Sequence, residues 1–377
     1  MKKIFSLLSL FLMCWSFAQE EQPTNASTID VNYFYGTIAN HNSDILHLIQ
    51  GHPEGMILSW NKKTFGKQSW QERFNYPDVG YSFAYQDLKN EYLGKNFSLY
   101  AHYNFYFLKR NLMLRIGQGL AYTTNPYDSE TNHRNVAFGT HIMSSTYLML
   151  NYKKERLFKT PFGLQAGLSL IHYSNANVKA PNTSINSITA NIGITYSLGA
   201  DNIDFIHTEK NNAAYKEKLG YNIVFRAGIN QSDVIGTRQF PFYIPAFYVD
   251  KRIGQLSAFQ AGAEVFFSRF LKEDIKYNSV AFPERNIDPE TDYKRIGLFV
   301  GHELFINKLS VETQLGYYVY YPYEFEKRVY VRVGLKRYFG KRYFGIASLK
   351  AHGAAAEAVE FGIGMRLGGN KKNNHDE

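Results

Sequence analysis

The sequence has 377 residues, of which 16% are aromatic, and its formal net charge is +9. Because its mean hydropathy is only -0.34, the many apolar residues must alternate with polar ones, which excludes a bundle of transmembrane helices. A positive charge this diffuse favours anionic lipid head groups over nucleic acid as a partner.

The N-terminus, residues 1–19, has the pattern of a cleaved signal peptide. A basic pair, Lys2-Lys3, precedes an apolar stretch that ends in the small-residue cleavage context Ser16-Phe17-Ala18. This stretch is too short to cross a bilayer as a helix. The only cysteine, Cys14, lies within it. We therefore expect an exported mature chain without disulfides, thiolate nucleophile or cysteine-ligated metal.

Apolar and polar residues alternate along the rest of the chain in segments of about ten residues, which matches transmembrane β-strands. Strands of soluble sandwiches average nearer five or six residues. Clear segments lie at residues 97–107, 112–122, 142–150, 188–198, 221–229, 257–267, 309–321 and 358–367, and weaker ones at 30–38, 56–62, 78–86, 242–249, 294–305, 329–338 and 343–351. We predict an all-β fold: one antiparallel transmembrane β-barrel of roughly 12–16 strands over residues 20–369. A polar tail, residues 370–377, follows it.

The lengths of the connections predict which strand ends face the periplasm, because such barrels have short periplasmic turns and longer outer loops. If the chain starts in the periplasm, the strand count puts the tight turns inside and the long polar loops outside. The tight turns are residues 108–110, 307–308 and 340–342, and the long loops are residues 123–136 and 271–293. The connection at residues 199–219 is long on the predicted inner side and departs from this pattern.

The segment at residues 162–198 places reactive groups on one strand face. Leu164, Leu168 and Leu170 share an apolar face, and His172 and Ser174 continue it, because residues i and i+2 of a strand lie on the same side. Asn186 extends the apolar row of the next strand. If the two strands pair as a hairpin, the three polar side chains meet on the lipid-facing wall at the outer rim.

This arrangement suits nucleophilic catalysis on an ester. A serine hydroxyl needs a base and a group that orients that base, roles open to His172 and Asn186 for Ser174. Backbone N–H groups of the loop and the amides of Asn182, Asn175 and Asn177 are candidates for stabilising an oxyanion or binding substrate. Ordinary interfacial residues and turn chemistry are the alternative interpretation.

The string His172-Tyr173-Ser174-Asn175-Ala176, followed by Pro181-Asn182, Asn186 and Tyr196-Ser197-Leu198, resembles the signature of the lipid A 3-O-deacylase, or acyloxyacyl hydrolase-like, family. The resemblance implies an esterase in the outer membrane of a Gram-negative cell that removes an acyl chain from lipid A. It also implies that Ser174 is the nucleophile, His172 the general base and Asn182 an oxyanion donor. The family pattern has glutamate where this sequence has Asn186, and an amide orients histidine without stabilising imidazolium by charge.

Two other function classes remain open. A channel would use the interior polar residues Gln165, Arg226, Glu264, Glu312 and Arg332. A catalytically inactive barrel with a structural or binding role would fit the amide at Asn186. We predict no cofactor and no metal site, because His102, His141 and His302 lie in different strands without ligand-like spacing. The predicted partner is lipid A or another lipid of the outer leaflet, and the sequence makes no prediction of oligomeric state.

Overall fold

The computed structural model describes residues 26–199, 205–207, 217–232, 234–340, 342–353 and 355–368. The predicted signal peptide, residues 1–19, and the predicted polar tail, residues 370–377, lie outside these residues. Sixteen β-strands account for most of the described chain, and their bounds agree within a few residues with the segments that alternation predicts.

In chain order the strands are β1 (Ser27–Ile38), β2 (Glu54–Lys62), β3 (Asp78–Asp87), β4 (Lys95–Phe107), β5 (Leu112–Thr123), β6 (Ile142–Lys154), β7 (Phe162–Ser174), β8 (Ile185–Leu198), β9 (Gly220–Asn230), β10 (Phe240–Arg252), β11 (Ser257–Ser268), β12 (Arg295–Phe305), β13 (Leu309–Tyr320), β14 (Val329–Phe339), β15 (Tyr343–His352) and β16 (Ala355–Gly368).

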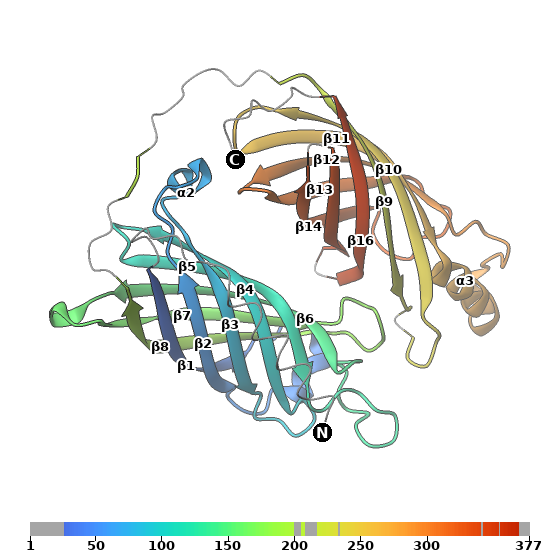
Figure 1. Ribbon diagram of the computed structural model, residues 1–377. Coiled ribbons are helices and arrows are strands. Elements are labelled where there is room, and N and C mark those ends of the chain that lie inside the picture. Colours follow the sequence, from blue (N-terminus) through green and yellow to red (C-terminus); the bar gives the residue numbers. More distant parts are fainter. Residues whose placement is uncertain are drawn as a thin grey trace, which may run out of the picture.

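These strands close into two antiparallel barrels of eight strands each (Figure 1). In the first barrel β8 returns to β1, so that Ser27 pairs with Leu198. In the second barrel β16 returns to β9, so that Gly368 pairs with Gly220. The expected all-β antiparallel barrel architecture is confirmed, but the expectation of one closed barrel over residues 20–369 has to be corrected to two.

The alternation of apolar and polar residues cannot distinguish one large barrel from two small ones. Alternation and turn length predict strands and the hairpins between neighbours, whereas barrel closure depends on pairing between strands distant in sequence, such as β1 with β8. Closure into two barrels also explains why one connection on the predicted inner side is long. The long connection at residues 199–219 is no periplasmic hairpin turn, because it joins the last strand of one barrel to the first strand of the next.

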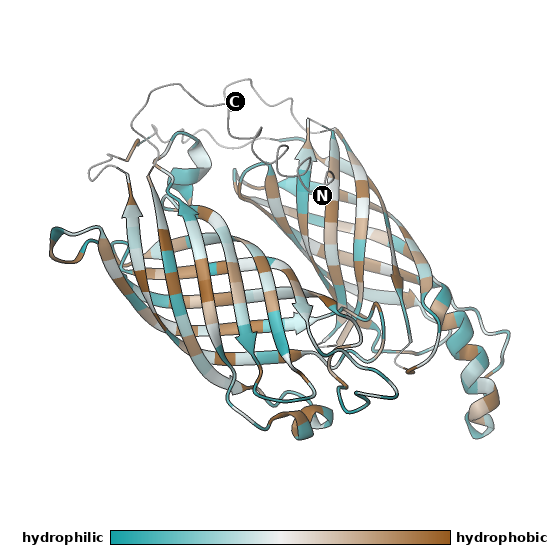
Figure 2. Cartoon of the chain, turned by 60° about the horizontal axis from the view of Figure 1, so that its bottom comes forward, coloured by the Kyte–Doolittle hydropathy of each residue, from teal (hydrophilic) through white to brown (hydrophobic). Residues whose placement is uncertain are grey.

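Side chains alternate between the lumen and the outer face along each strand, because successive residues of a strand point to opposite sides. In β1, Ile29 and Val31 are exposed, whereas Asp30 and Asn32 are buried. Figure 2 shows the hydrophobic residues that recur along the strands of both barrels. Both barrels therefore present the apolar outer surface that a transmembrane barrel requires.

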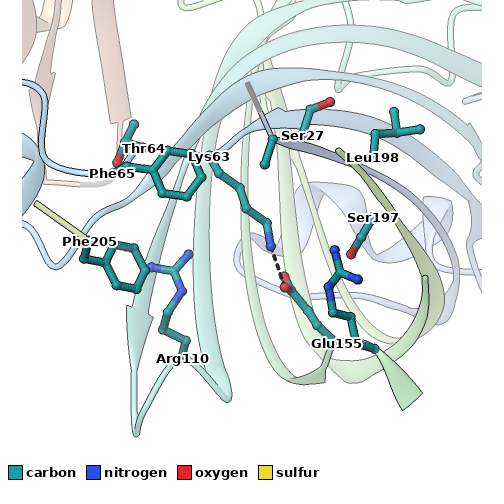
Figure 3. Close-up of a pocket in the computed structure, with 11 residues that line it drawn as sticks. Ser27, Lys63, Thr64, Phe65, Arg110, Glu155, Ser197, Leu198 and Phe205 are labelled. Carbon is teal, nitrogen blue, oxygen red and sulfur yellow. Dashed lines mark hydrogen bonds and ion pairs between the residues drawn. The ribbon is translucent and has the colours of Figure 1, made fainter. Parts of the chain in front are cut away.

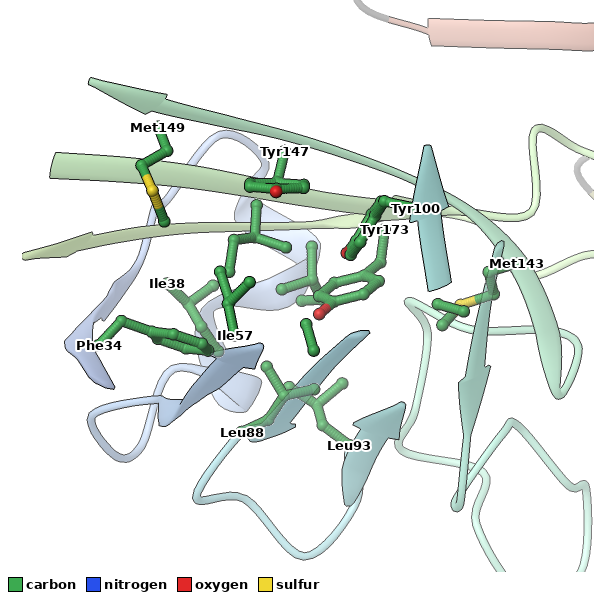
Figure 4. Close-up of a cluster of buried hydrophobic side chains, with 14 of the residues drawn as sticks. Phe34, Ile38, Ile57, Leu88, Leu93, Tyr100, Met143, Tyr147, Met149 and Tyr173 are labelled. Carbon is green, nitrogen blue, oxygen red and sulfur yellow. The ribbon is translucent and has the colours of Figure 1, made fainter. Parts of the chain in front are cut away.

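The lumen of the first barrel holds an apolar cluster and a polar network. Figure 4 shows the cluster, in which Phe34, Tyr147 and Tyr173 are fully buried. Nearer the start of β1, the fully buried side chains of Asp30 and Arg115 form an ion pair of 2.7 Å. Side chains from opposite walls therefore meet across this lumen and hold the strands in register.

The second barrel is filled by buried ion pairs. Arg332 lies 2.8 Å from Glu264 and 2.6 Å from Glu360, and Arg226 lies 3.1 Å from Glu312. An eight-stranded barrel has a lumen just wide enough for side chains to fill, whereas barrels of sixteen or more strands leave an aqueous channel. The interior residues invoked for a channel do face the lumens. Arg226, Glu264, Glu312 and Arg332 pair with one another in the second barrel, and Gln165 bonds to Asp30 and Asn32 in the first, which argues against a pore.

Short helices occupy several connections: η1 (Ser43–Leu48), α2 (Ser69–Arg73), η2 (Leu157–Lys159), α3 (Arg269–Ala281) and η3 (Pro283–Arg285). The helix α3 lies in the connection that the sequence predicts to be a long polar loop (Figure 1). Within the described ranges, no helix combines the length and apolarity needed to cross a membrane.

Candidate active site

The segment predicted to carry the site folds as the hairpin of β7 and β8, joined by a loop at residues 175–184. Leu164 and Leu168 are 50% and 61% exposed on the outer face, whereas Tyr173 is fully buried in the lumen. His172 and Ser174 have the same parity as these leucines, so both project from the outer side of β7, where His172 is half-buried and Ser174 buried. They stand at the end of the row of apolar residues that faces hydrocarbon.

His172 pairs across the hairpin with Asn186 of β8. Its Nδ1 lies 2.7 Å from Oδ1 of Asn186. Because a carbonyl oxygen only accepts hydrogen bonds, Nδ1 must carry the hydrogen, and the lone pair of the neutral ring then lies on Nε2. Asn186 thereby orients the ring and selects the tautomer with a basic Nε2.

Ser174 is the last residue of β7 and is only 5% exposed. Its Oγ donates to Oδ1 of Asn182 at 3.1 Å and accepts the N–H of Ala176 at 2.9 Å. The same Oδ1 accepts the N–H of Asn175 at 2.9 Å, which fixes the orientation of the amide. The hydrogen bonds of the described chain leave the Nδ2 hydrogens of Asn182 available, so a donor stands beside the hydroxyl.

The side-chain amides of Asn175 and Asn177 stabilise the loop by hydrogen bonds to backbone carbonyl groups. Nδ2 of Asn175 donates to the carbonyl oxygen of Lys179 at 2.6 Å, and Nδ2 of Asn177 donates to the carbonyl oxygen of Gln231 at 3.3 Å. Both amides are buried. Of the three asparagines predicted to bind oxyanion or substrate, the structure brings Asn182 to the serine and engages the amides of Asn175 and Asn177 elsewhere.

Ser174 and His172 are neighbours on one face, yet they are not hydrogen-bonded to each other in the described residues, because the hydroxyl donates to Asn182. Nor does any Asp or Glu of the described ranges form a hydrogen bond or ion pair with His172. The only side chain that fixes the ring there is the Asn186 amide. A carboxylate from elsewhere in the described chain therefore does not replace the missing glutamate.

The first barrel supports the loop through the long connection between β5 and β6. The N–H of Thr183 donates to the carbonyl oxygen of Val136 at 3.2 Å. A Cβ at Gly139 would lie 2.4 Å from the carbonyl oxygen of Lys179, so only glycine allows this approach. The loop backbone thus rests directly on the neighbouring connection.

The second barrel supports the same loop through the connection between β9 and β10. The backbone N–H of Gln231 donates to the carbonyl oxygen of Asn177 at 3.1 Å, and its Oε1 accepts the N–H of Ala180 at 3.2 Å. Nε2 of Gln239 donates to the carbonyl oxygen of Val178 at 2.7 Å. Sequence reasoning missed these contacts, since a glutamine in a loop carries no signal of its partner.

One acidic group orders the supporting connection. The backbone N–H groups of Thr131 and Glu130 donate to Asp128 at 2.8 Å and 3.0 Å, and these hydrogen bonds lower the pKa of the Asp128 carboxyl. The positive charge of Lys179 in the site loop lowers this pKa further.

Polar residues on the neighbouring strands share the face of His172 and were also missed. Thr146 of β6 pairs with His172, and Gln118 of β5 pairs with Thr146. The sequence held a signal for one of them, because Gln118 interrupts an apolar row formed by Ile116 and Leu120.

A pocket of about 230 Å³ lies at the opposite end of the first barrel, where β1 begins and β8 ends (Figure 3). Lys63 and Glu155 lie in its lining and form an ion pair of 2.6 Å. Because the full length of the strands separates it from Ser174, this pocket has no part in the candidate site.

Comparisons with known proteins bear on both barrels. Residues 54–195 match the profile of the lipid A 3-O-deacylase family (PagL), and residues 219–371 match that of the acyloxyacyl hydrolase C-terminal domain. A search of curated protein sequences finds no match.

Solved structures similar to the chain include the outer membrane protein Omp33 of Acinetobacter baumannii, with 8% identity over 92% of this chain and 100% of that one, and a TM-score of 0.18. A mutant porin of Rh. blastica has 8% identity over 90% of this chain and 98% of its own, again with a TM-score of 0.18. The two family profiles divide the chain as the two barrels do. The chain is an outer-membrane protein and belongs to the lipid A 3-O-deacylase, or acyloxyacyl hydrolase-like, family of hydrolases.

Proposed function

We propose that the protein hydrolyses an acyl ester of lipid A at the outer wall of the first barrel, with Ser174 as nucleophile and His172 as general base. The observation that carries the proposal is the oriented pair of His172 and Asn186 beside Ser174 on the hydrocarbon-facing row. Polar groups on such a surface are costly unless they are hydrogen-bonded or close to the interface, so their presence there favours a function. A lipid of the outer leaflet presents its ester bonds to this rim without leaving the membrane.

Acylation begins when Oγ of Ser174 attacks the ester carbonyl carbon and Nε2 of His172 takes the hydroxyl proton. The carbonyl oxygen becomes an oxyanion, which Nδ2 of Asn182 stabilises as hydrogen-bond donor. Collapse of this intermediate breaks the bond to the sugar oxygen. His172 returns the proton to that oxygen, and an acyl-serine remains.

Deacylation repeats the chemistry with water. His172 takes a proton from a water molecule that attacks the acyl carbon. The bond to Ser174 breaks, His172 returns the proton to Oγ, and a fatty acid leaves. Each proton removed is thus given back, and the enzyme returns to its starting state.

The hydroxyl of Ser174 has to turn from Asn182 towards His172 before the first step. In the proposed step the hydroxyl turns by rotation about the Cα–Cβ bond of Ser174, while the N–H of Asn175 keeps the backbone hydrogen-bonded to Asn182. Catalytic hydrogen bonds are often unmade in the free enzyme and form in the substrate complex. The contact between Ser174 and Asn182 therefore describes a resting state.

Purified protein in detergent is expected to lower the mass of lipid A by one acyl chain and to release the matching fatty acid. Mass spectrometry of the glycolipid and of the free fatty acids measures both products. Lipid A of unchanged mass, both in this assay and in cells that express the protein, would contradict the proposal and favour a barrel without catalysis.

A further inference from the structure

The loop between β7 and β8 is anchored on both sides of Asn182, the proposed oxyanion donor. After Asn182, the N–H of Thr183 donates to the carbonyl oxygen of Val136 in the first barrel at 3.2 Å. Before it, the N–H of Ala180 donates to Oε1 of Gln231 in the second barrel at 3.2 Å. Asn182 therefore lies between two fixed points of the backbone, and each barrel supplies one of them.

The anchor from the second barrel is a buried side chain turned towards the loop. Gln231 directly follows β9 and is only 2% exposed. Its Nε2 donates to the carbonyl oxygen of Val234 at 3.3 Å and to Oγ1 of Thr237 at 3.1 Å. A reversed carboxamide would give up these two acceptors and direct an N–H at the N–H of Ala180. The contacts with its own connection therefore keep the acceptor oxygen of Gln231 aimed at the loop.

The N–H of Ala180 depends on this acceptor. Ala180 is 3% exposed, and the hydrogen bonds of the described residues give its N–H no other partner. A buried N–H without an acceptor is costly, so losing Oε1 of Gln231 would drive the backbone to shift towards water. Because Asn182 is only two residues further along the chain, such a shift moves its carboxamide relative to Ser174.

We propose that Gln231 is a positioning residue for hydrolysis in the first barrel, because it holds the loop so that the carboxamide of Asn182 stands beside Ser174; this rests on the proposed function of Ser174. The oxyanion exists only in the tetrahedral intermediate. A displaced donor therefore slows the chemical step and leaves binding of the lipid unchanged. The second barrel takes part in the reaction although the reacting groups lie on the first.

Gln231→Met tests the proposal, because it keeps the length of the side chain and removes both hydrogen-bonding atoms. The hydrogen bonds between the backbone of Gln231 and Asn177 remain, so the loop stays attached. Release of fatty acid from lipid A in detergent should show kcat lowered about 10-fold and KM changed by less than about 2-fold. Gln260→Met is the matched control: this carboxamide is buried in β11 without a hydrogen-bond partner among the described residues, and its loss should change neither constant.

A second substitution at Asn182 separates positioning from a loss of stability. Asn182→Ala alone should lower kcat by about 10²-fold, because it removes the oxyanion donor. If Gln231 acts through Asn182, adding Gln231→Met to this variant should lower kcat no further. Losses that multiply would overturn the proposal. An unchanged kcat in Gln231→Met, or an equal loss in Gln260→Met, would overturn it as well.

Hydrogen exchange measured by mass spectrometry reports on the loop without using the reaction. Gln231→Met should speed exchange in the peptide that covers the loop and leave the peptides of β7 and β8 unchanged. Loop exchange equal to that of the wild type would overturn the proposal whatever the kinetics. If the wild-type protein releases no fatty acid, the esterase proposal fails, and faster loop exchange in Gln231→Met still supports the hold of Gln231 on this loop.

Discussion

Ser174→Ala is expected to lower the release of fatty acid from lipid A by at least ~10³-fold, because it removes the proposed nucleophile, the hydroxyl that contacts Asn182 on the face of His172. His172→Gln should cost about as much, since the serine needs a base. Fatty acid release by each purified variant, normalised to folded barrel, measures the effect. Ser184→Ala is the control: this serine lies in the same loop, where its Oγ is 3.3 Å from His41, and its loss should leave turnover near that of the wild type.

A double variant distinguishes the loss of one catalytic unit from two separate structural effects. Residues that act as one catalytic unit show non-additive losses, so Ser174→Ala combined with His172→Gln should be no slower than either single variant. Losses that multiply would indicate two independent, structural effects and would argue against a nucleophile and its base.

Asn186→Asp is expected to raise kcat by about 10-fold or more, because it puts a negative charge where the neutral amide oxygen now contacts the imidazole. Asp and Asn have the same shape, so the 2.7 Å contact with Nδ1 is kept. The charge stabilises the imidazolium that forms when His172 accepts the proton. The initial rate of fatty acid release under saturating lipid A measures this gain.

Two further variants separate orientation from charge at this position. Asn186→Ala removes the acceptor of the Nδ1 hydrogen and should lower kcat below the wild-type value. Asn186→Leu also lacks an acceptor for this hydrogen and should lower kcat in the same way. An Asn186→Asp protein that is no faster than the wild type would mean that charge on the ring does not limit turnover.

The strands were predictable because one face of each is apolar and the other polar or small. The first barrel shows this in Leu164, Leu168 and Leu170, whose parity alone predicts that His172 and Ser174 lie on the outer face. Barrel closure was not predictable in this way. It depends on the pairing of β1 with β8, and the alternation within either strand is the same in one large barrel or two small ones.

The helix α3 was missed although the sequence contains its pattern. Phe270, Leu271, Asp274, Ile275 and Asn278 are its buried residues, a spacing typical of a helix with one buried side. The charged residues between them led to the prediction of a polar loop.

Within the site, the sequence predicts which residues share a face but not which atoms pair. The contact of His172 with Asn186 follows from a hairpin register, whereas the choice of Asn182 over Asn175 and Asn177 depends on the course of the loop. The support from Gln231 depends on how the second barrel meets that loop and leaves no trace in residue spacing.

Ser174, on the hydrocarbon-facing side of β7, is the proposed nucleophile. A long-chain alkyl fluorophosphonate tests this role most directly, since it reacts with an activated serine and reaches the site from the lipid phase. Peptide mapping by mass spectrometry should find one phosphonyl group on Ser174, in proportion to the loss of hydrolysis, and none in the Ser174→Ala protein. A phosphonyl group on another residue that accounts for the lost activity, or hydrolysis that persists when Ser174 is fully modified, would contradict the claim.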